Sequence, residues 1–223
     1  MPDPTTRPYR STLRQEQARQ TRERILDAAG EVFAARGYAG ASLAEIATAA
    51  GVSVESVKVH GPKRALLLAA FERAFGGEAG EESLAHRPEV AAIAALDDPE
   101  RILAELVPVI ALANARTGAL WAAFTAAARD DEEVGRVLAG LLERRHADYG
   151  RMIDLLAAKG ADGARDLDAA GRRALADALS FVMSPEGHQQ LVVESGWAFD
   201  RYRDWLLDTV RTLVRAGSAA STG

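Results

Sequence analysis

A short stretch of the chain, residues 53–63, gathers side chains whose hydrogen-bonding groups suit contact with nucleic acid. Lys58 can donate to guanine O6 and N7 or to a phosphate, and Ser56 can reach a phosphate. Glu55 can accept from the N4 amino group of cytosine, although its carboxylate repels nearby phosphates. The alternative is that these charges lie on a solvated helical surface. The residue types therefore predict DNA contact if a single helix presents them together.

Two short helices joined by a tight turn are predicted around this stretch. Ser42, with Glu45 three residues later, forms a capping box that satisfies the unpaired N–H groups at the start of a helix. Gly51 then turns the chain, and Ser53 can cap a second helix over residues 54–60. Two helices joined in this way can deliver a row of side chains to a DNA groove.

A longer helix is expected before this pair and another after it. From Leu13 helix-forming residues predominate, with apolar side chains at helical spacing as far as Phe33, and Gly37 is the expected end. Pro62 suits the first turn of the following helix. Residues 1–12, which include three prolines, are expected to form a disordered tail.

The order and spacing of these features resemble the N-terminal module of TetR family transcriptional regulators. The matching segments are Ile25-Leu26-Asp27-Ala28-Ala29, Gly37-Tyr38, Ser42-Leu43-Ala44-Glu45-Ile46-Ala47 and Ala50-Gly51-Val52-Ser53. The resemblance implies a helix-turn-helix DNA-binding domain over residues 13–75, whose recognition helix, residues 54–60, enters the major groove. It also implies that Lys63 is the counterpart of the family's phosphate-contacting lysine. The DNA-binding candidates are Ser42, Ser53, Glu55, Ser56, Lys58, His60 and Lys63.

Residues 54–63 depart from the family pattern. Lys58 stands where a tyrosine is common, and an expected phenylalanine before the next helix is absent. These departures leave open a second hypothesis, an all-helical ligand-binding or scaffold protein of TetR-like fold that has lost specific DNA recognition. A steep fall of log K with log salt would distinguish DNA binding from this alternative, because phosphate contacts release counterions.

Residues 76–223 are expected to form a second domain made only of helices, so the predicted fold class is all-α. The resemblance implies that this domain binds a ligand and forms a homodimer, with helices over residues 168–183 and 198–216 pairing with their copies. Five apolar residues near one face of the last helix are the dimer-interface candidates, although a core stripe within one chain has the same pattern. They are Phe199, Tyr202, Leu206, Val210 and Leu213.

Candidates for the lining of a small-molecule pocket come from the middle of this domain. They are Trp121, Phe124, His146, Tyr149 and Met152. Aromatic and Met side chains at helical spacing also form ordinary hydrophobic cores, and the pattern identifies no ligand.

The composition of the chain indicates which partners are expected: nucleic acid, a metal or cofactor, or a membrane. The net charge of -5 divides into +3 over residues 1–75 and -8 over the remainder, so a mildly basic module precedes an acidic one. The chain has no cysteine, and its four histidines lack the spacing of a helical zinc pair, so no metal and no cofactor are expected. No apolar run approaches the ~20 residues of a membrane span, so a cytoplasmic protein with no membrane partner is expected.

The leading hypothesis is a ligand-responsive repressor. As a homodimer it would bind a pseudo-palindromic operator in double-stranded DNA, and a small-molecule effector acting as inducer would release it. An enzyme is the least favoured class, because the sequence has no phosphate-binding glycine loop, no G-x-S-x-G, no H-E-x-x-H and no cysteine nucleophile.

Overall fold

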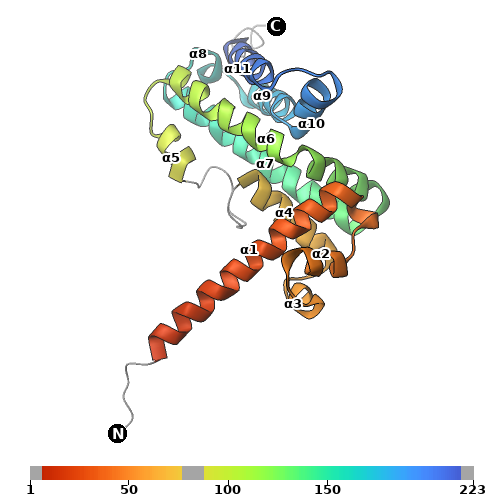
Figure 1. Ribbon diagram of the computed structural model, residues 1–223. Coiled ribbons are helices and arrows are strands. Elements are labelled where there is room, and N and C mark those ends of the chain that lie inside the picture. Colours follow the sequence, from red (N-terminus) through yellow and green to blue (C-terminus); the bar gives the residue numbers. More distant parts are fainter. Residues whose placement is uncertain (1–6, 77–87, 217–223) are drawn as a thin grey trace. The chain divides into compact units, whose positions relative to one another are not determined.

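The structure is a computed structural model that describes residues 7–76 and 88–216 (Figure 1). Both ranges consist of helices joined by turns and contain no strand, which confirms the predicted all-α class. The chain divides into two compact units, Met1–Gly80 and Glu81–Gly223, which we call the head and the body. The two predicted domains are separated by residues 76–82. Of these, only Gly76 belongs to the described residues.

The described part of the head contains α1 (Arg7–Gly40), α2 (Leu43–Ala50), α3 (Val54–Val59) and α4 (Lys63–Gly76). α1 packs against both α2 and α4, and α3 contacts α2 (Figure 1). Ile25, Phe33, Ile46 and Leu66 from the three larger helices are fully buried between them. Val57 is the buried residue of α3, so this small core also fixes which face of α3 points outward.

The first helix begins earlier than its sequence predicts. α1 starts at Arg7, so the prediction of a disordered tail up to residue 12 is wrong for its second half. Pro8 is compatible with this helix, because a proline in the first turn lacks only an N–H group that has no partner within the helix. The predicted end is confirmed at Gly37, whose φ of 68° interrupts the helical backbone.

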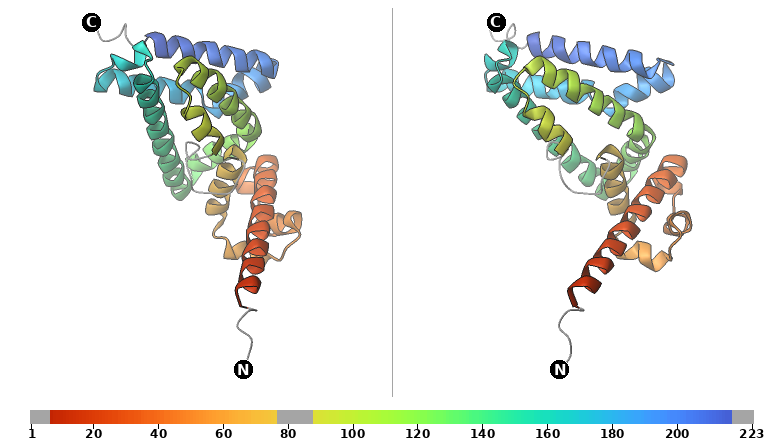
Figure 2. Two further views of the ribbon diagram at one scale, coloured as in Figure 1. Left: turned by 90° about the vertical axis from the view of Figure 1, so that its left-hand side faces the viewer. Right: turned by 60° about the vertical axis from the view of Figure 1, so that its left-hand side comes forward.

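The body is a set of helices packed around one hydrophobic core (Figure 2). Its described elements are α5 (Pro88–Ala94), α6 (Pro99–Asp130), α7 (Glu132–Ala158), α8 (Asp162–Arg165), α9 (Ala169–Val182), α10 (Pro185–His188), the π-helical turn η3 (Gln189–Glu194) and α11 (Phe199–Ala216). α6 and α7 form a pair joined at Asp131, whose side chain caps α7 by accepting from the N–H groups of Glu133 and Val134. α9 packs on α7, and α11 packs on both α6 and α9.

The longest helix of the body runs through a glycine without a break: α6 continues through Gly118 to Asp130. A glycine inside a helix costs only about 1 kcal/mol relative to alanine, and burial of Leu120, Trp121 and Phe124 offsets that cost. The connection from α7 to α9 contains a short helix, α8.

The length of α6 also corrects the expectation about apolar runs. This helix holds an 18-residue window of mean hydropathy 1.3, which is apolar enough to span a membrane by composition. Within the body, 56% of that window is buried. A core helix that is covered by its neighbours has this composition as well.

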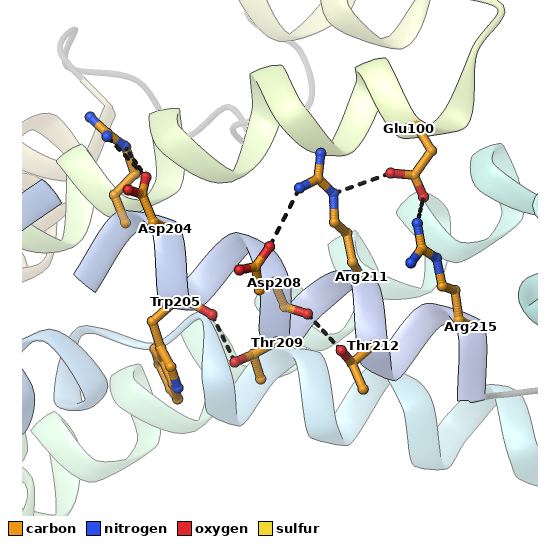
Figure 3. Close-up of polar contacts among 9 residues, drawn as sticks. Glu100, Asp204, Trp205, Asp208, Thr209, Arg211, Thr212 and Arg215 are labelled. Carbon is orange, nitrogen blue, oxygen red and sulfur yellow. Dashed lines mark hydrogen bonds and ion pairs between the residues drawn. The ribbon is translucent and has the colours of Figure 1, made fainter. Parts of the chain in front are cut away.

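The last helix has one face in the core of its own chain. Tyr202, Leu206 and Val210 on α11 are fully buried within the body. At the start of α6, Glu100 accepts hydrogen bonds from Arg211 Nε at 3.1 Å and from Arg215 Nη2 at 3.0 Å (Figure 3). α11 therefore lies along α6, and these contacts fix its register.

Candidate nucleic-acid interface

The start of α2 is fixed by the predicted capping box. The Oγ of Ser42 accepts from the Glu45 N–H at 3.2 Å, and Glu45 Oε2 accepts from the Ser42 N–H at 2.9 Å. The Ser42 hydroxyl also donates to Glu45 Oε2 at 2.8 Å. These hydrogen bonds stabilise the carboxylate and hold the pKa of Glu45 below its usual range. In the free head, the Ser42 hydroxyl therefore serves the cap.

A tight turn at Gly51 then sets the direction of α3 relative to α2. Gly51 adopts φ 65°, the left-handed conformation that glycine tolerates best, and the Val52 N–H donates to Ala47 O at 3.0 Å. The Ser53 Oγ accepts from the Ser56 N–H at 3.1 Å and lies 2.9 Å from the Ser56 Oγ. Both serine hydroxyls are thus close to the first turn of α3. Backbone N–H groups at the start of a helix can also donate hydrogen bonds to a phosphate.

The outward face of α3 carries three exposed side chains, Glu55, Lys58 and Val59. Residues three and four apart lie on one side of a helix, so these three share a face opposite the buried Val57. The side chains of Glu55 and Lys58 make no hydrogen bond or ion pair with any described residue. The structure therefore presents an acceptor, a cation and an apolar group side by side. Sequence reasoning missed Val59, although its place two residues after the inward Val57 indicates an outward direction.

Lys63 has a structural partner that the sequence did not reveal. Its Nζ donates to Ala41 O at 2.9 Å and lies 4.4 Å from the centroid of the Tyr38 ring. The side chain thus joins the start of α4 to the segment between α1 and α2. An ammonium group has three donors, so a phosphate contact from Lys63 stays a prediction.

The connection from α3 to α4 is short and runs from His60 to Pro62. His60 ends α3, its N–H donates to Val57 O at 3.0 Å, and its side chain is half-buried. Burial, with a smaller effect from Arg22, lowers the pKa of His60. Gly61 then adopts φ 116°, a conformation that side-chain-bearing residues rarely adopt. The chain therefore turns from α3 into α4 at a glycine.

In the body, the structure separates the five pocket candidates into two groups. Trp121, Phe124, Tyr149 and Met152 are buried, and the rings of Trp121 and Phe124 lie 6.2 Å apart. Burial raises the pKa of the Tyr149 hydroxyl. By contrast, the His146 side chain is 40% exposed, and its Nδ1 lies 3.2 Å from Asp177 Oδ1 on α9.

A buried polar cluster in the body was not predicted. Asn114 is fully buried on α6, and its Nδ2 donates to Met183 O at 3.0 Å and to the Tyr202 hydroxyl at 3.2 Å. The Asn114 Oδ1 and the Nδ1 of the buried His188 are without hydrogen-bond partners among the described residues. The His188 ring lies 5.3 Å from that of Tyr202, and burial lowers the pKa of His188. An asparagine within the apolar stripe of residues 99–130 was the available signal.

The dimer-interface candidates also divide. Tyr202, Leu206 and Val210 have no exposed surface, whereas Phe199 and Leu213 are half-buried. The three central residues of the five candidates therefore belong to the hydrophobic core of their own chain. The physical reason is that α6 and α9 cover this face of α11.

Comparisons with known proteins agree with this geometry. The family model described as "Bacterial regulatory proteins, tetR family" matches residues 25–70, which run from the middle of α1 to the middle of α4. A candidate transcriptional regulator from Pseudomonas aeruginosa PAO1 has a similar solved structure, with TM-score 0.66 and 21% identity over 89% of this chain and 92% of that one.

A second solved structure is a candidate transcriptional regulator from Saccharomonospora viridis in complex with choline. It has TM-score 0.62 and 22% identity over 86% of this chain and 96% of that one. At these identities the two likenesses show the fold. No curated protein matches the chain. Residues 25–70 thus match the tetR family of bacterial regulatory proteins over the helix-turn-helix module, and this match supports a DNA-binding transcriptional regulator.

Proposed function

We propose that this regulator is a repressor that binds a pseudo-palindromic operator as a homodimer and is released by a small-molecule effector. The observation that carries the DNA-binding part is the exposed face of α3, which a capped turn and the buried Val57 hold outward. Lys58 would donate to guanine or phosphate, and Glu55 would accept from cytosine N4. Lys63 and the hydroxyls of Ser53 and Ser56 would contact the backbone.

A homodimer would place two α3 helices in successive major grooves, about 34–36 Å apart. α9 and α11 each expose one large aromatic side chain, Phe181 at 77% and Trp205 at 37%. On α11, Thr209 and Thr212 point away from Glu100, and their hydroxyls donate to their own helix backbone at 2.8 Å (Figure 3). Burial of this face against a second copy would therefore leave no threonine donor unpaired, which supports an interface here rather than at the buried stripe.

An effector site is supported by the polar cluster in the body. Buried polar atoms without partners are unfavourable, so a ligand that donates hydrogen bonds would be stabilised by Asn114 Oδ1 and by neutral His188 Nδ1. The Saccharomonospora viridis relative holds choline, so choline is the first compound to test. Binding to one conformation of the body more tightly than to the other would shift the population of DNA-binding dimers.

Footprinting on the DNA upstream of the chain's own gene tests the DNA-binding mode. The proposal predicts two protected half-sites whose centres are one helical turn apart, about 10 bp. Lys58→Ala should weaken this protection, whereas Arg129→Ala, at an exposed position of the body, should not. Uniform weak protection of all sequences would refute the repressor and leave a ligand-binding protein of the same fold.

Thermal shift measurements test the effector. A ligand at 100 times its dissociation constant should stabilise the native body by ~2.7 kcal/mol and reduce protection of the operator. His188→Phe should fold but lose this ligand response. A ligand that stabilises both proteins equally would place the effector site elsewhere. As a repressor of this kind, the protein would act in the cytoplasm and would need no catalytic activity.

A further inference from the structure

Val59 is the one large apolar side chain of the described head that is exposed to solvent, and its exposed fraction is 83%. The other exposed large apolar side chains in the described ranges belong to the body: Leu112, Phe181, Val193 and Trp205. Val59 ends α3, and no packing within the head explains an aliphatic side chain at this position. An isolated exposed valine is common on protein surfaces, so its position relative to other groups must decide what it does.

Val59 follows directly after Lys58 and lies one helical turn from Glu55 on the same face. The three side chains have different chemistry. Lys58 can only donate hydrogen bonds, the Glu55 carboxylate can only accept them, and Val59 can do neither. In the major groove, the C5-methyl of thymine is the apolar group that a base presents. A face with one donor, one acceptor and one aliphatic group is therefore matched to guanine, cytosine and thymine.

We infer that Val59 is a specificity-determining residue that packs against the C5-methyl of one thymine in each half-site. This inference rests on the proposed DNA-binding function and adds a base preference to it. Side chains one turn apart have Cβ atoms about 5–6 Å apart, and base pairs along a strand are 3.4 Å apart. The thymine should therefore lie one or two base pairs from the G·C pair that Lys58 and Glu55 contact.

The test starts from duplexes that the full-length protein selects out of a random pool at physiological salt. Each thymine of the selected half-site is then replaced by deoxyuridine, which removes the methyl and keeps every hydrogen-bonding group. Loss of one buried methyl corresponds to ~0.8 kcal/mol, or about a fourfold loss of affinity per half-site. The expected result is a loss of this size at one thymine position and little effect at the others.

Two variants assign the effect to this side chain. Val59→Ala should bind the thymine and deoxyuridine duplexes with nearly equal affinity, because the two Cγ methyl groups that would pack on the thymine methyl are then missing and the alanine Cβ is too short to replace them. Val193→Ala, at an exposed valine of the body, should retain the fourfold difference. Since Val59 is exposed, Val59→Ala should unfold at the same temperature as the parent protein, which a thermal melt can check.

The outcomes separate the inference from the function on which it rests. Specific binding that is insensitive to deoxyuridine at every position overturns the inference and leaves the regulator intact. A deoxyuridine effect that is equal in the parent and in Val59→Ala also overturns it, because another group then reads the methyl. Failure to enrich any sequence overturns both the inference and the proposed function.

Discussion

Gly163 in α8 offers a steric test of the body's packing. An alanine Cβ at this position would lie 2.0 Å from Val214 O and 2.9 Å from Arg215 O on α11. Both are backbone atoms, so relief requires the end of α11 to move by roughly 1 Å, which is beyond what rotation of a side chain can supply. That shift would loosen Val214, which is 4% exposed. Overpacking of this kind costs about 1–3 kcal/mol, and we expect Gly163→Ala to lose ~2 kcal/mol of unfolding free energy.

Gly150→Ala is the matched control. Gly150 lies in the middle of α7, and a Cβ there would meet nothing within 4 Å. Removal of a glycine from a helix interior stabilises by roughly 0.5–1 kcal/mol, so the two substitutions should have opposite signs. Urea unfolding followed by circular dichroism at one protein concentration measures the difference, expected to be ~3 kcal/mol. Two results would contradict the close contact between α8 and α11: a Gly163→Ala variant as stable as the parent, or equal changes in stability, of the same sign, in both variants.

Three further substitutions have definite expected results. Lys63→Ala should lower the unfolding free energy by about 1–2 kcal/mol, because the hydrogen bond to Ala41 O is lost. The same substitution should reduce the slope of log K for DNA binding against log salt by roughly 1. Unchanged stability in urea titrations would contradict the structural role of Lys63, and an unchanged slope in salt titrations would contradict its phosphate contact. Glu100→Gln should cost less than about 1 kcal/mol, because its ion pairs to Arg211 and Arg215 are partly exposed, and the cost should disappear in ~1 M salt. Because burial lowers the pKa of His188, the unfolded chain binds more protons below about pH 6.5, so stability should fall as the pH drops from there. Urea melts between about pH 7.5 and 5 should show a smaller fall for His188→Phe, and an identical fall would contradict the assignment.

The parts of the head that depend on local chemistry were predictable from the sequence. The capping box of Ser42 and Glu45, the turn at Gly51 and the cap at Ser53 involve residues within four positions of one another, and all are present. Such features need no knowledge of distant packing. The direction of Val59 could have been derived in the same way from the inward position of Val57.

The parts that depend on contacts between distant segments were not predictable. Lys63 bonds to Ala41, and Asn114 bonds to the carbonyl of Met183, partners that no spacing rule identifies. Helical periodicity correctly gave the apolar face of α11 but could not say whether that face meets its own chain or a second copy. The continuity of α6 across Gly118 likewise depends on burial by neighbouring helices, which outweighs the local preference of glycine.

The most direct measurement of the central claim compares the affinity of the full-length protein for its selected duplex with that for a scrambled duplex of equal composition. Fluorescence anisotropy at about 0.15 M salt provides both dissociation constants. A regulator that reads bases through the exposed face of α3 should prefer the selected duplex by at least about a thousandfold, and Lys58→Ala should reduce that preference. Equal affinity for the two duplexes would contradict the assignment of α3 as a recognition helix.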